Sequence, residues 1–232
     1  MIAASELFQQ PLPCDLFEAL LDRRQPVHQW LPAIACVLQA FFKNCPFKDR
    51  THSTIPSGLT INGEVFIGEN VRLPAFGTIE GPAYIGNDCE LRPGVYIRGN
   101  VIVGNACVLG NSCEFKNALL FDEVAAPHFN YVGDSILGYK AHLGAGSILS
   151  NLRFDCQPVR MRAPSGEMTE TGLKKLGAMV GDSAEIGCNA VLQPGSCLFP
   201  QTIVFPGEIF KGTRVRSLNN SQKSCSELQK SF

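Results

Sequence analysis

The chain has 232 residues, a formal net charge of −1 and ten cysteines. A nearly neutral chain has no overall field that would recruit nucleic acid or an acidic membrane, so we expect neither as a partner. The cysteines form no CxxC pair, and the sequence shows no signal peptide and no apolar run of spanning length. These features predict reduced thiols and a cytoplasmic location.

Two segments near the start carry helical spacing of apolar residues. They cover residues 14–24 and 29–43 and are separated by Pro26. This pattern predicts two amphipathic helices, and we assign residues 1–56 to an N-terminal helical cap.

From there on, a bulky apolar residue returns at every sixth position. The positions are Ile67, Leu73, Ile79, Ile85, Leu91, Ile97, Val103, Leu109 and Phe115, then Leu137, Leu143 and Leu149, then Val180, Ile186, Leu192, Leu198 and Val204. The residue two places earlier is mostly small or slender, as in Ala83 and Cys107. Glycine often follows the bulky residue, as in Gly86 and Gly104, which predicts tight corners with positive φ.

A period of six fits neither a helix nor a long amphipathic strand, and it is typical of a parallel β-helix. Three hexads would close one triangular coil of 18 residues, with both columns pointing inward. We assign residues 57–212 to about five or six such coils. Because an open end would expose unpaired backbone, we expect the N-terminal helices to pack on the first coil.

Two stretches break the hexad pattern, at residues 122–131 and 152–176. We interpret both as inserted loops, which in repeat proteins carry function more often than the scaffold does. The second is rich in charge. Residues 213–232 form a polar C-terminal tail that either frays or makes a short helix.

Several polar residues near the first break are candidates for chemistry. His128 lies within it, and His142 precedes an inward leucine and therefore points outward. A histidine near its ordinary pKa can act as a general base. Arg92 and Lys116 also fall outside the inward columns and together could form an anion site, with Tyr131 close by in sequence.

A family resemblance rests on residues 91–153, with the motifs RPG, GNSCEFKNALL, PHFNYVGDSILG and HLGAGSILSN. This stretch of about sixty residues resembles the acetyltransferase domain of the hexapeptide-repeat enzymes that combine glucosamine-1-phosphate acetyltransferase and N-acetylglucosamine-1-phosphate uridylyltransferase. The chain looks closer still to stand-alone proteins related to UDP-N-acetylglucosamine pyrophosphorylase. The resemblance implies an all-β fold, a left-handed parallel β-helix of hexapeptide repeats with a short N-terminal helical cap.

The resemblance also implies roles for particular residues. His128 matches the catalytic base, and Asn151 matches an asparagine that orients the substrate or the base. Arg92, Lys116 and Tyr131 match residues that contact the sugar phosphate. The turn formed by Gly144, Ala145 and Gly146 matches the position against the acetyl-CoA arm. His142 stands where the family has an asparagine that contacts the amino sugar.

The resemblance implies an acyltransferase, with His128 as general base, that moves an acetyl group from acetyl-CoA, as co-substrate, to an amino-sugar phosphate or nucleotide-linked sugar in cell-envelope precursor metabolism. Acyl transfer of this kind needs no metal, and the resemblance implies a homotrimer. The alternative is a non-catalytic module that binds sugar nucleotides or assembles with a separate nucleotidyltransferase. A zinc-dependent carbonic anhydrase would need three converging histidines, and this stretch offers His128 and His142.

Overall fold

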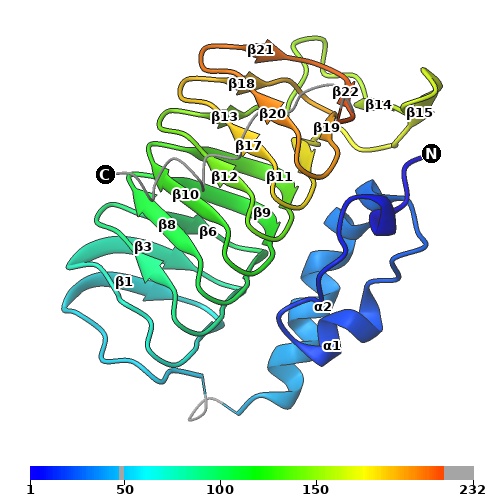
Figure 1. The fold of residues 1–232 in the computed structure, drawn as a ribbon. Helices are drawn as coiled ribbons and strands as arrows, with labels where there is room; N and C mark the ends of the chain where they lie inside the picture. Colours follow the sequence, from blue (N-terminus) through cyan, green and yellow to red (C-terminus); the bar gives the residue numbers. More distant parts are fainter. Residues whose placement is uncertain (47–49, 217–232) are drawn as a thin grey trace.

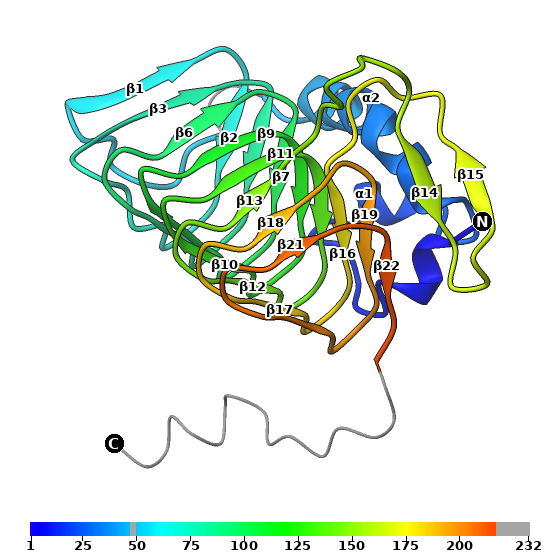
Figure 2. The ribbon, with the colours of Figure 1, turned by 90° about the horizontal axis from the view of Figure 1, so that it is seen from above.

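A computed structural model describes residues 1–46 and 50–216, in which parallel strands wind into a three-sided prism beside two helices (Figure 1). Seen from above, the helices lie against one side of the prism (Figure 2). The predicted left-handed parallel β-helix is confirmed. Within the described ranges, no helix is both long and apolar enough to cross a membrane.

The first face of the prism stacks eight strands in the described part of the chain, which is more than the five or six coils expected. Its register is continuous, since Ile79 pairs with Ile97 and Ile97 with Phe115. The strands are β1 (Gly58–Asn62), β3 (Phe76–Glu80), β6 (Tyr96–Arg98), β9 (Glu114–Leu120), β11 (Tyr131–Leu137), β13 (Ile148–Leu149), β18 (Val191–Leu192) and β21 (Ile209–Phe210).

The other two faces are built in the same way. The second face has the strands β5 (Glu90–Leu91), β8 (Val108–Asn111), β10 (Ala125–His128), β12 (His142–Leu143), β17 (Glu185–Ile186) and β20 (Ile203–Val204). The third face has β2 (Val65–Ile67), β4 (Ala83–Ile85), β7 (Val101–Val103), the second halves of β9 and β11, β16 (Ala178–Val180), β19 (Ser196–Leu198) and β22 (Thr213–Arg214).

The predicted inward columns fill the prism. Ile67, Ile97 and Phe115 have no exposed surface, and the small residues Ala83 and Cys107 beside them are also fully buried. One continuous apolar core therefore runs along the axis and is shared by every coil.

The first break in the hexad pattern is not an inserted loop. Strand β10 lies in it and pairs in parallel with β8 below and β12 above. The inward spacing shortens to five residues, from Phe115 to Leu120 and from Val132 to Leu137, where β9 and β11 bend from the first face to the third. Both shortened steps fall at the same corner, so the coils stay stacked while the sequence pattern shifts.

The glycines after the bulky residues have a different purpose from the one predicted. A Cβ on Gly86 would lie 2.7 Å from the carbonyl oxygen of Gly104, so these residues are small because successive coils touch there. The left-handed backbone comes two residues later in the coil. At one corner it is adopted by Asn70, Asp88, Ala106, Glu123, Lys140, Ser183 and Gln201.

The N-terminal helices lie along the third face and do not cap the first coil. Helix α1 (Asp15–Leu20) and helix α2 (Trp30–Asn44) follow short 3-10 turns at Ala4–Glu6 and Val27–Gln29. From β2 to β19, the outward residue of each third-face strand is apolar, and packing of the helices removes this column from water. This outward column consists of Phe66, Tyr84, Ile102, Leu119, Ile136, Met179 and Cys197.

The second break, residues 152–176, does leave the coil. It contains an antiparallel hairpin of β14 (Arg160–Arg162) and β15 (Met168–Glu170), which stands beside the last coils (Figures 1 and 2). Of the predicted polar tail, residues 213–216 are described, and Thr213–Arg214 form β22. The remainder, residues 217–232, lies outside the described residues.

Candidate functional site

The predicted site residues fall into two groups on neighbouring faces of the prism. Lys116 and Tyr131 lie on the first face, and Asn151 follows the first-face strand β13. Arg92, His128 and His142 belong to the second face.

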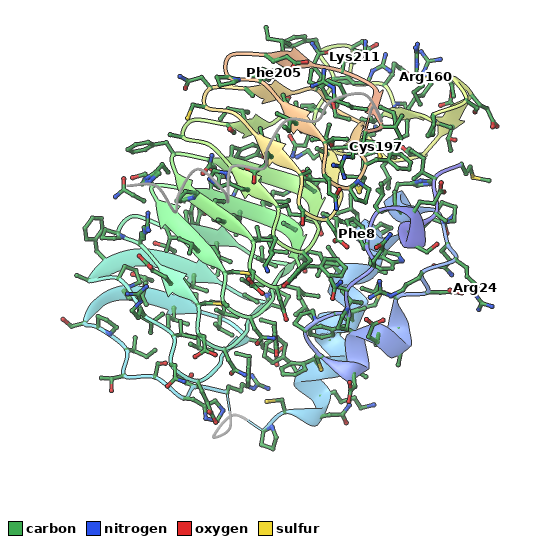
Figure 3. The ribbon with its side chains drawn as sticks, in the orientation of Figure 1. Phe8, Arg24, Arg160, Cys197, Phe205 and Lys211 are labelled. Carbon is green, nitrogen blue, oxygen red and sulfur yellow. The ribbon has the colours of Figure 1, made fainter. Side chains whose placement is uncertain are left out.

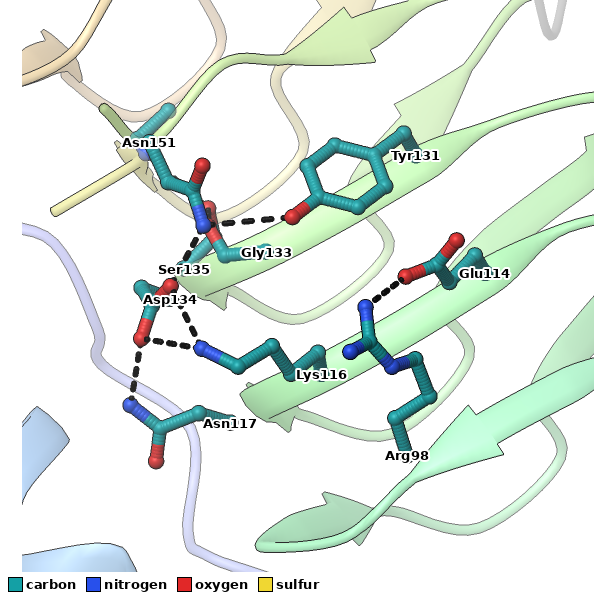
Figure 4. Close-up of polar contacts among 10 residues, drawn as sticks. Arg98, Glu114, Lys116, Asn117, Tyr131, Gly133, Asp134, Ser135 and Asn151 are labelled. Atoms are coloured by element: carbon teal, nitrogen blue, oxygen red, sulfur yellow. Dashed lines mark hydrogen bonds and ion pairs between the residues drawn. The ribbon is translucent and has the colours of Figure 1, made fainter. Parts of the chain in front are cut away.

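The first-face group is organised by a carboxylate that was not predicted, that of Asp134 (Figure 4). It accepts hydrogen bonds from Lys116 Nζ at 3.2 Å, Asn117 Nδ2 at 2.9 Å and Asn151 Nδ2 at 2.5 Å. Asp134 is only 4% exposed. Its buried carboxylate is paired with the ammonium of Lys116, which lies closer to the surface. The contact holds the ammonium and the amide of Asn151 on one coil edge.

Tyr131 closes this group. Asn151 Nδ2 donates to the phenol oxygen at 3.2 Å, so one amide bridges Tyr131 and Asp134. Burial raises the pKa of Tyr131, and the nearby carboxylate of Glu114 raises it further. The phenol therefore stays protonated at neutral pH and can donate a hydrogen bond. Glu114 is paired with Arg98 at 2.6 Å on the coil below (Figure 4).

On the second face, Arg92 reaches upward toward the strand that carries His128. Its Nε lies 2.8 Å from Glu90, and its Nη1 lies 3.5 Å from the carbonyl oxygen of Pro127. Gly110 lies between them, and a Cβ there would come within 1.7 Å of that same carbonyl oxygen. The glycine thus allows the backbone of β10 to lie close to the coil below.

The position of His128 is fixed by its backbone. Its N–H donates to the side-chain oxygen of Asn130 at 3.1 Å, and its carbonyl oxygen accepts from the N–H of Gly146 at 3.0 Å. Asn130 is buried in the core and donates to the carbonyl oxygen of Gly144 at 2.9 Å. The structure therefore brings the predicted base and the predicted acetyl-CoA turn together, while the His128 side chain stays exposed at the corner.

The turn itself has one backbone donor to spare. The N–H groups of Gly144 and Gly146 donate to the carbonyl oxygens of Ile186 and His128. Among the described residues, the N–H of Ala145 has no acceptor within hydrogen-bond range. It is the group in this turn that could donate to a ligand.

His142 pairs with a carboxylate that was also not predicted. Its Nδ1 lies 2.8 Å from Glu185 Oε2, because β12 and β17 stack in register and place these two residues opposite each other. The 43-residue separation spans the second insertion, so the 18-residue coil period does not link the two positions. Asp134, in contrast, belongs to the Tyr-x-Gly-Asp motif and could have been found from it.

The structure does not gather Arg92 and Lys116 into one anion site. They lie on different faces, and each is paired with its own carboxylate, Glu90 or Asp134. Within the described ranges, no three His, Cys, Asp or Glu side chains converge as a metal site would require.

Comparison with known proteins finds relatives for the central part of the chain. Residues 79–163 match the family described as the GMPPB C-terminal domain. The chain is 33% identical over 101 residues to a bifunctional sugar-1-phosphate nucleotidylyltransferase/acetyltransferase of Sulfurisphaera tokodaii, covering 44% of this chain and 25% of that protein. It is 39% identical over 87 residues to the bifunctional protein GlmU of Methanococcus maripaludis, covering 38% and 21%. The matched segment thus spans about a fifth to a quarter of these relatives.

Among solved structures, the polysialic-acid-specific acetyltransferase NeuO shows 12% identity with a TM-score of 0.33, over 77% of this chain and 93% of that one. The family match, over residues 79–163, includes every predicted site residue from Arg92 to Asn151. The chain is built of six-residue repeats, and part of it is similar in sequence to the bifunctional protein GlmU and to a bifunctional sugar-1-phosphate nucleotidylyltransferase/acetyltransferase.

Proposed function

We propose that this protein transfers an acetyl group from acetyl-CoA to an amino sugar that carries a phosphate or a nucleotide. The observation that supports this most is the Lys116, Asp134, Asn151 and Tyr131 group. It presents a cation, an amide and a protonated phenol side by side on a coil edge, and these are the groups that recognise phosphate and sugar hydroxyls. One relative, 33% identical over 101 residues, is named as a bifunctional sugar-1-phosphate nucleotidylyltransferase/acetyltransferase.

In the proposed reaction, His128 takes a proton from the sugar amine as the nitrogen attacks the thioester carbonyl. The tetrahedral oxyanion accepts a hydrogen bond from the free N–H of Ala145, in the turn that is bonded to His128. Coenzyme A then leaves as the thiol when the C–S bond breaks, taking up the proton that His128 removed. No covalent enzyme intermediate is required.

Replacing the base tests this proposal. With glucosamine 1-phosphate and acetyl-CoA as substrates, release of free thiol can be followed for the wild type and for His128→Ala. Loss of general-base catalysis should lower kcat by about 10²–10⁴-fold. His52→Ala is the matched control, because His52 is also exposed and lies outside the proposed site. Equal turnover by wild type and His128→Ala would remove His128 from the mechanism.

A non-catalytic binding module is the second candidate function, and one observation favours it. Within the described chain, no side chain hydrogen-bonds the imidazole of His128, whereas most catalytic bases are oriented by a third group. Thermal shift distinguishes the two functions, since a bound ligand raises the melting temperature. Stabilisation by UDP-sugars without any thiol release from acetyl-CoA would favour the binding module.

A further inference from the structure

A cavity of about 750 Å³ lies between the second insertion and the last coils. Arg160 on the hairpin and Lys211 near the end of the prism both contribute to it, and they lie at the same end of the molecule in Figure 3. This volume is in the range of pockets that enclose a ligand of nucleotide size, about 300–1,000 Å³. A single phosphate would fill only a small part of it.

The floor of this cavity continues the face that carries the Lys116 group. Strands β13, β18 and β21 pair in register above β11. Gln193 directly follows the inward residue of β18, and Lys211 directly follows that of β21. Lys116 has the same place after the inward Phe115 of β9. Both Gln193 and Lys211 line the cavity. The cavity and the Lys116 group are therefore parts of one face, and Asn151 adjoins the insertion that forms the wall.

The wall is anchored to the prism. Met161 is buried between the exposed residues Arg160 and Arg162, so the two arginines lie on the opposite side of the strand from the packed side. A Cβ on Gly195 would lie 2.5 Å from the carbonyl oxygen of Arg160, which shows how closely the hairpin approaches the coil. At the base of the insertion, the N–H of Leu176 donates to the carbonyl oxygen of Asn151 at 2.9 Å.

The charges that line the cavity are mostly positive. Arg153 is neutralised by Asp155, with Nε 2.9 Å from the carboxylate, but Arg160 has only a loose contact of 3.9 Å with Glu170. In the described part of the chain, the guanidinium of Arg162 and the ammonium of Lys211 make no ion pair. The cavity thus offers uncompensated cations to an anionic ligand.

An aromatic ring lines the same cavity as these cations. Phe154 lines the cavity and its side chain is fully exposed, which is an unfavourable place for a phenyl ring without a partner. Guanidinium groups bind phosphates through paired hydrogen bonds, and an exposed ring offers a stacking surface for a planar base. Cations and a free ring in one cavity match a molecule that has both phosphates and a base.

We propose that this cavity binds a nucleoside diphosphate group, with the phosphates on Arg160, Arg162 and Lys211 and the base against Phe154. Two ligands share this chemistry, a nucleotide sugar and coenzyme A. The link to the Lys116 group rests on the proposed function. The cavity itself does not, because it follows from volume, charge and the exposed ring.

Calorimetric titration of the full chain with UDP, ADP, uridine and inorganic phosphate tests the cavity directly. We expect UDP or ADP to bind more tightly than uridine and phosphate. The double variant Arg160→Gln/Arg162→Gln and the single variant Lys211→Gln should each weaken that binding about tenfold or more, which corresponds to losing one charge-assisted contact. Lys211 is on the coil, so its variant tests the cavity without touching the hairpin. Arg24→Gln is the control, being a highly exposed arginine on the N-terminal segment.

The variant Lys116→Gln distinguishes the two ligands, because only one of them should lose affinity for it. A nucleotide sugar such as UDP-N-acetylglucosamine would extend to the Lys116 group and lose affinity in Lys116→Gln, whereas coenzyme A would lose affinity only in the cavity variants. The proposal is overturned if neither UDP nor ADP binds, if phosphate alone binds as tightly, or if the cavity variants bind like the wild type.

Failure of the cavity and failure of acyl transfer give different results. If the cavity variants release thiol with unchanged KM values, the proposed acetyltransferase activity is supported and the proposed nucleotide site is contradicted. Arginine-dependent nucleotide binding in a protein that never consumes acetyl-CoA would do the reverse.

Discussion

At the scale of single residues, Asp134 organises the first-face group of the candidate site. It is buried, adopts a left-handed backbone with φ of 47°, and receives hydrogen bonds from three side chains. Aspartate and asparagine tolerate this conformation better than most residues, because their short polar side chains can bond locally. One residue therefore both turns the corner and positions Lys116 and Asn151.

Two substitutions separate these roles. Asp134→Asn keeps the corner and removes the charge, and should lower the free energy of unfolding by about 1–3 kcal/mol through loss of the charged contact to Lys116. Asp134→Ala should cost more, since it also strains the backbone and leaves Lys116 and two amides without their acceptor. Urea denaturation measures both. Unfolding midpoints equal to that of the wild type would show that Asp134 contributes nothing to stability.

At the scale of elements, Asp182 attaches the N-terminal segment to the prism. Its two carboxylate oxygens accept from the backbone N–H groups of Gln9 at 2.7 Å and Tyr139 at 2.8 Å. Burial raises the pKa of Asp182, although these backbone donors oppose the effect. The folded state therefore holds the proton more tightly than the unfolded state, where the pKa is about 3.9.

The sign of the resulting pH dependence is fixed by linkage. The stabilising effect of this proton is complete below the unfolded pKa and is lost as pH rises through the higher folded pKa. Asp182→Asn does not titrate, so the wild type should lose stability relative to the variant as pH rises from about 4 through the raised folded-state pKa. Denaturation of both proteins across this range measures the difference. A difference that is constant with pH would contradict the raised pKa.

The covered third face gives a second prediction at this scale. Ile102 and Ile209 both point outward from their strands, but Ile102 is fully buried under the helices and Ile209 is 69% exposed. Ile102→Ala should therefore cost about 2–5 kcal/mol of unfolding free energy, and Ile209→Ala within about 0.5 kcal/mol of zero. Thermal or urea unfolding compares the pair. Equal costs would mean that the helices do not pack on this face in solution.

The same elements show what could be predicted from sequence. The coils were predictable because the six-residue period of inward apolar residues repeats many times, so one irregular residue does not obscure the period. The covered face was also within reach, since Phe66, Tyr84 and Ile102 recur 18 residues apart at outward positions. The shortened corner at Asn117 was not, because a five-residue step looks the same as a loop until strand pairing is known. Glu185 was hidden by the insertion that separates it from His142.

At the scale of the whole molecule, the exposed corner bears on assembly. His128 and Phe129 lie together there, with Phe129 58% exposed. If neighbouring prisms pack against this corner, residues of a second chain complete the site. We predict a closed threefold trimer, because the resemblance of residues 91–153 to hexapeptide-repeat acetyltransferases implies a homotrimer and closed symmetry is the usual state of homo-oligomers.

Light scattering at micromolar concentration measures the assembly. The expected mass is about 76 kDa, three times the 25.2 kDa of one chain. Phe129→Asp should shift the mass toward that of one chain, because a charge would then be buried between prisms. A wild-type mass of one chain would place the whole site within a single prism.

The other corner, where left-handed residues follow the stacked glycines, bears on the thermal stability of this molecule. Ala106 and Gln201 hold a left-handed backbone that costs an ordinary residue about 1–2 kcal/mol. Glycine or asparagine would relieve much of that cost at each place without altering a face, a pocket or the core. The turns are thus a row of separately adjustable positions. Successive substitutions at this corner should therefore raise the melting temperature by separate increments, without changing the residues on the faces that form the candidate site.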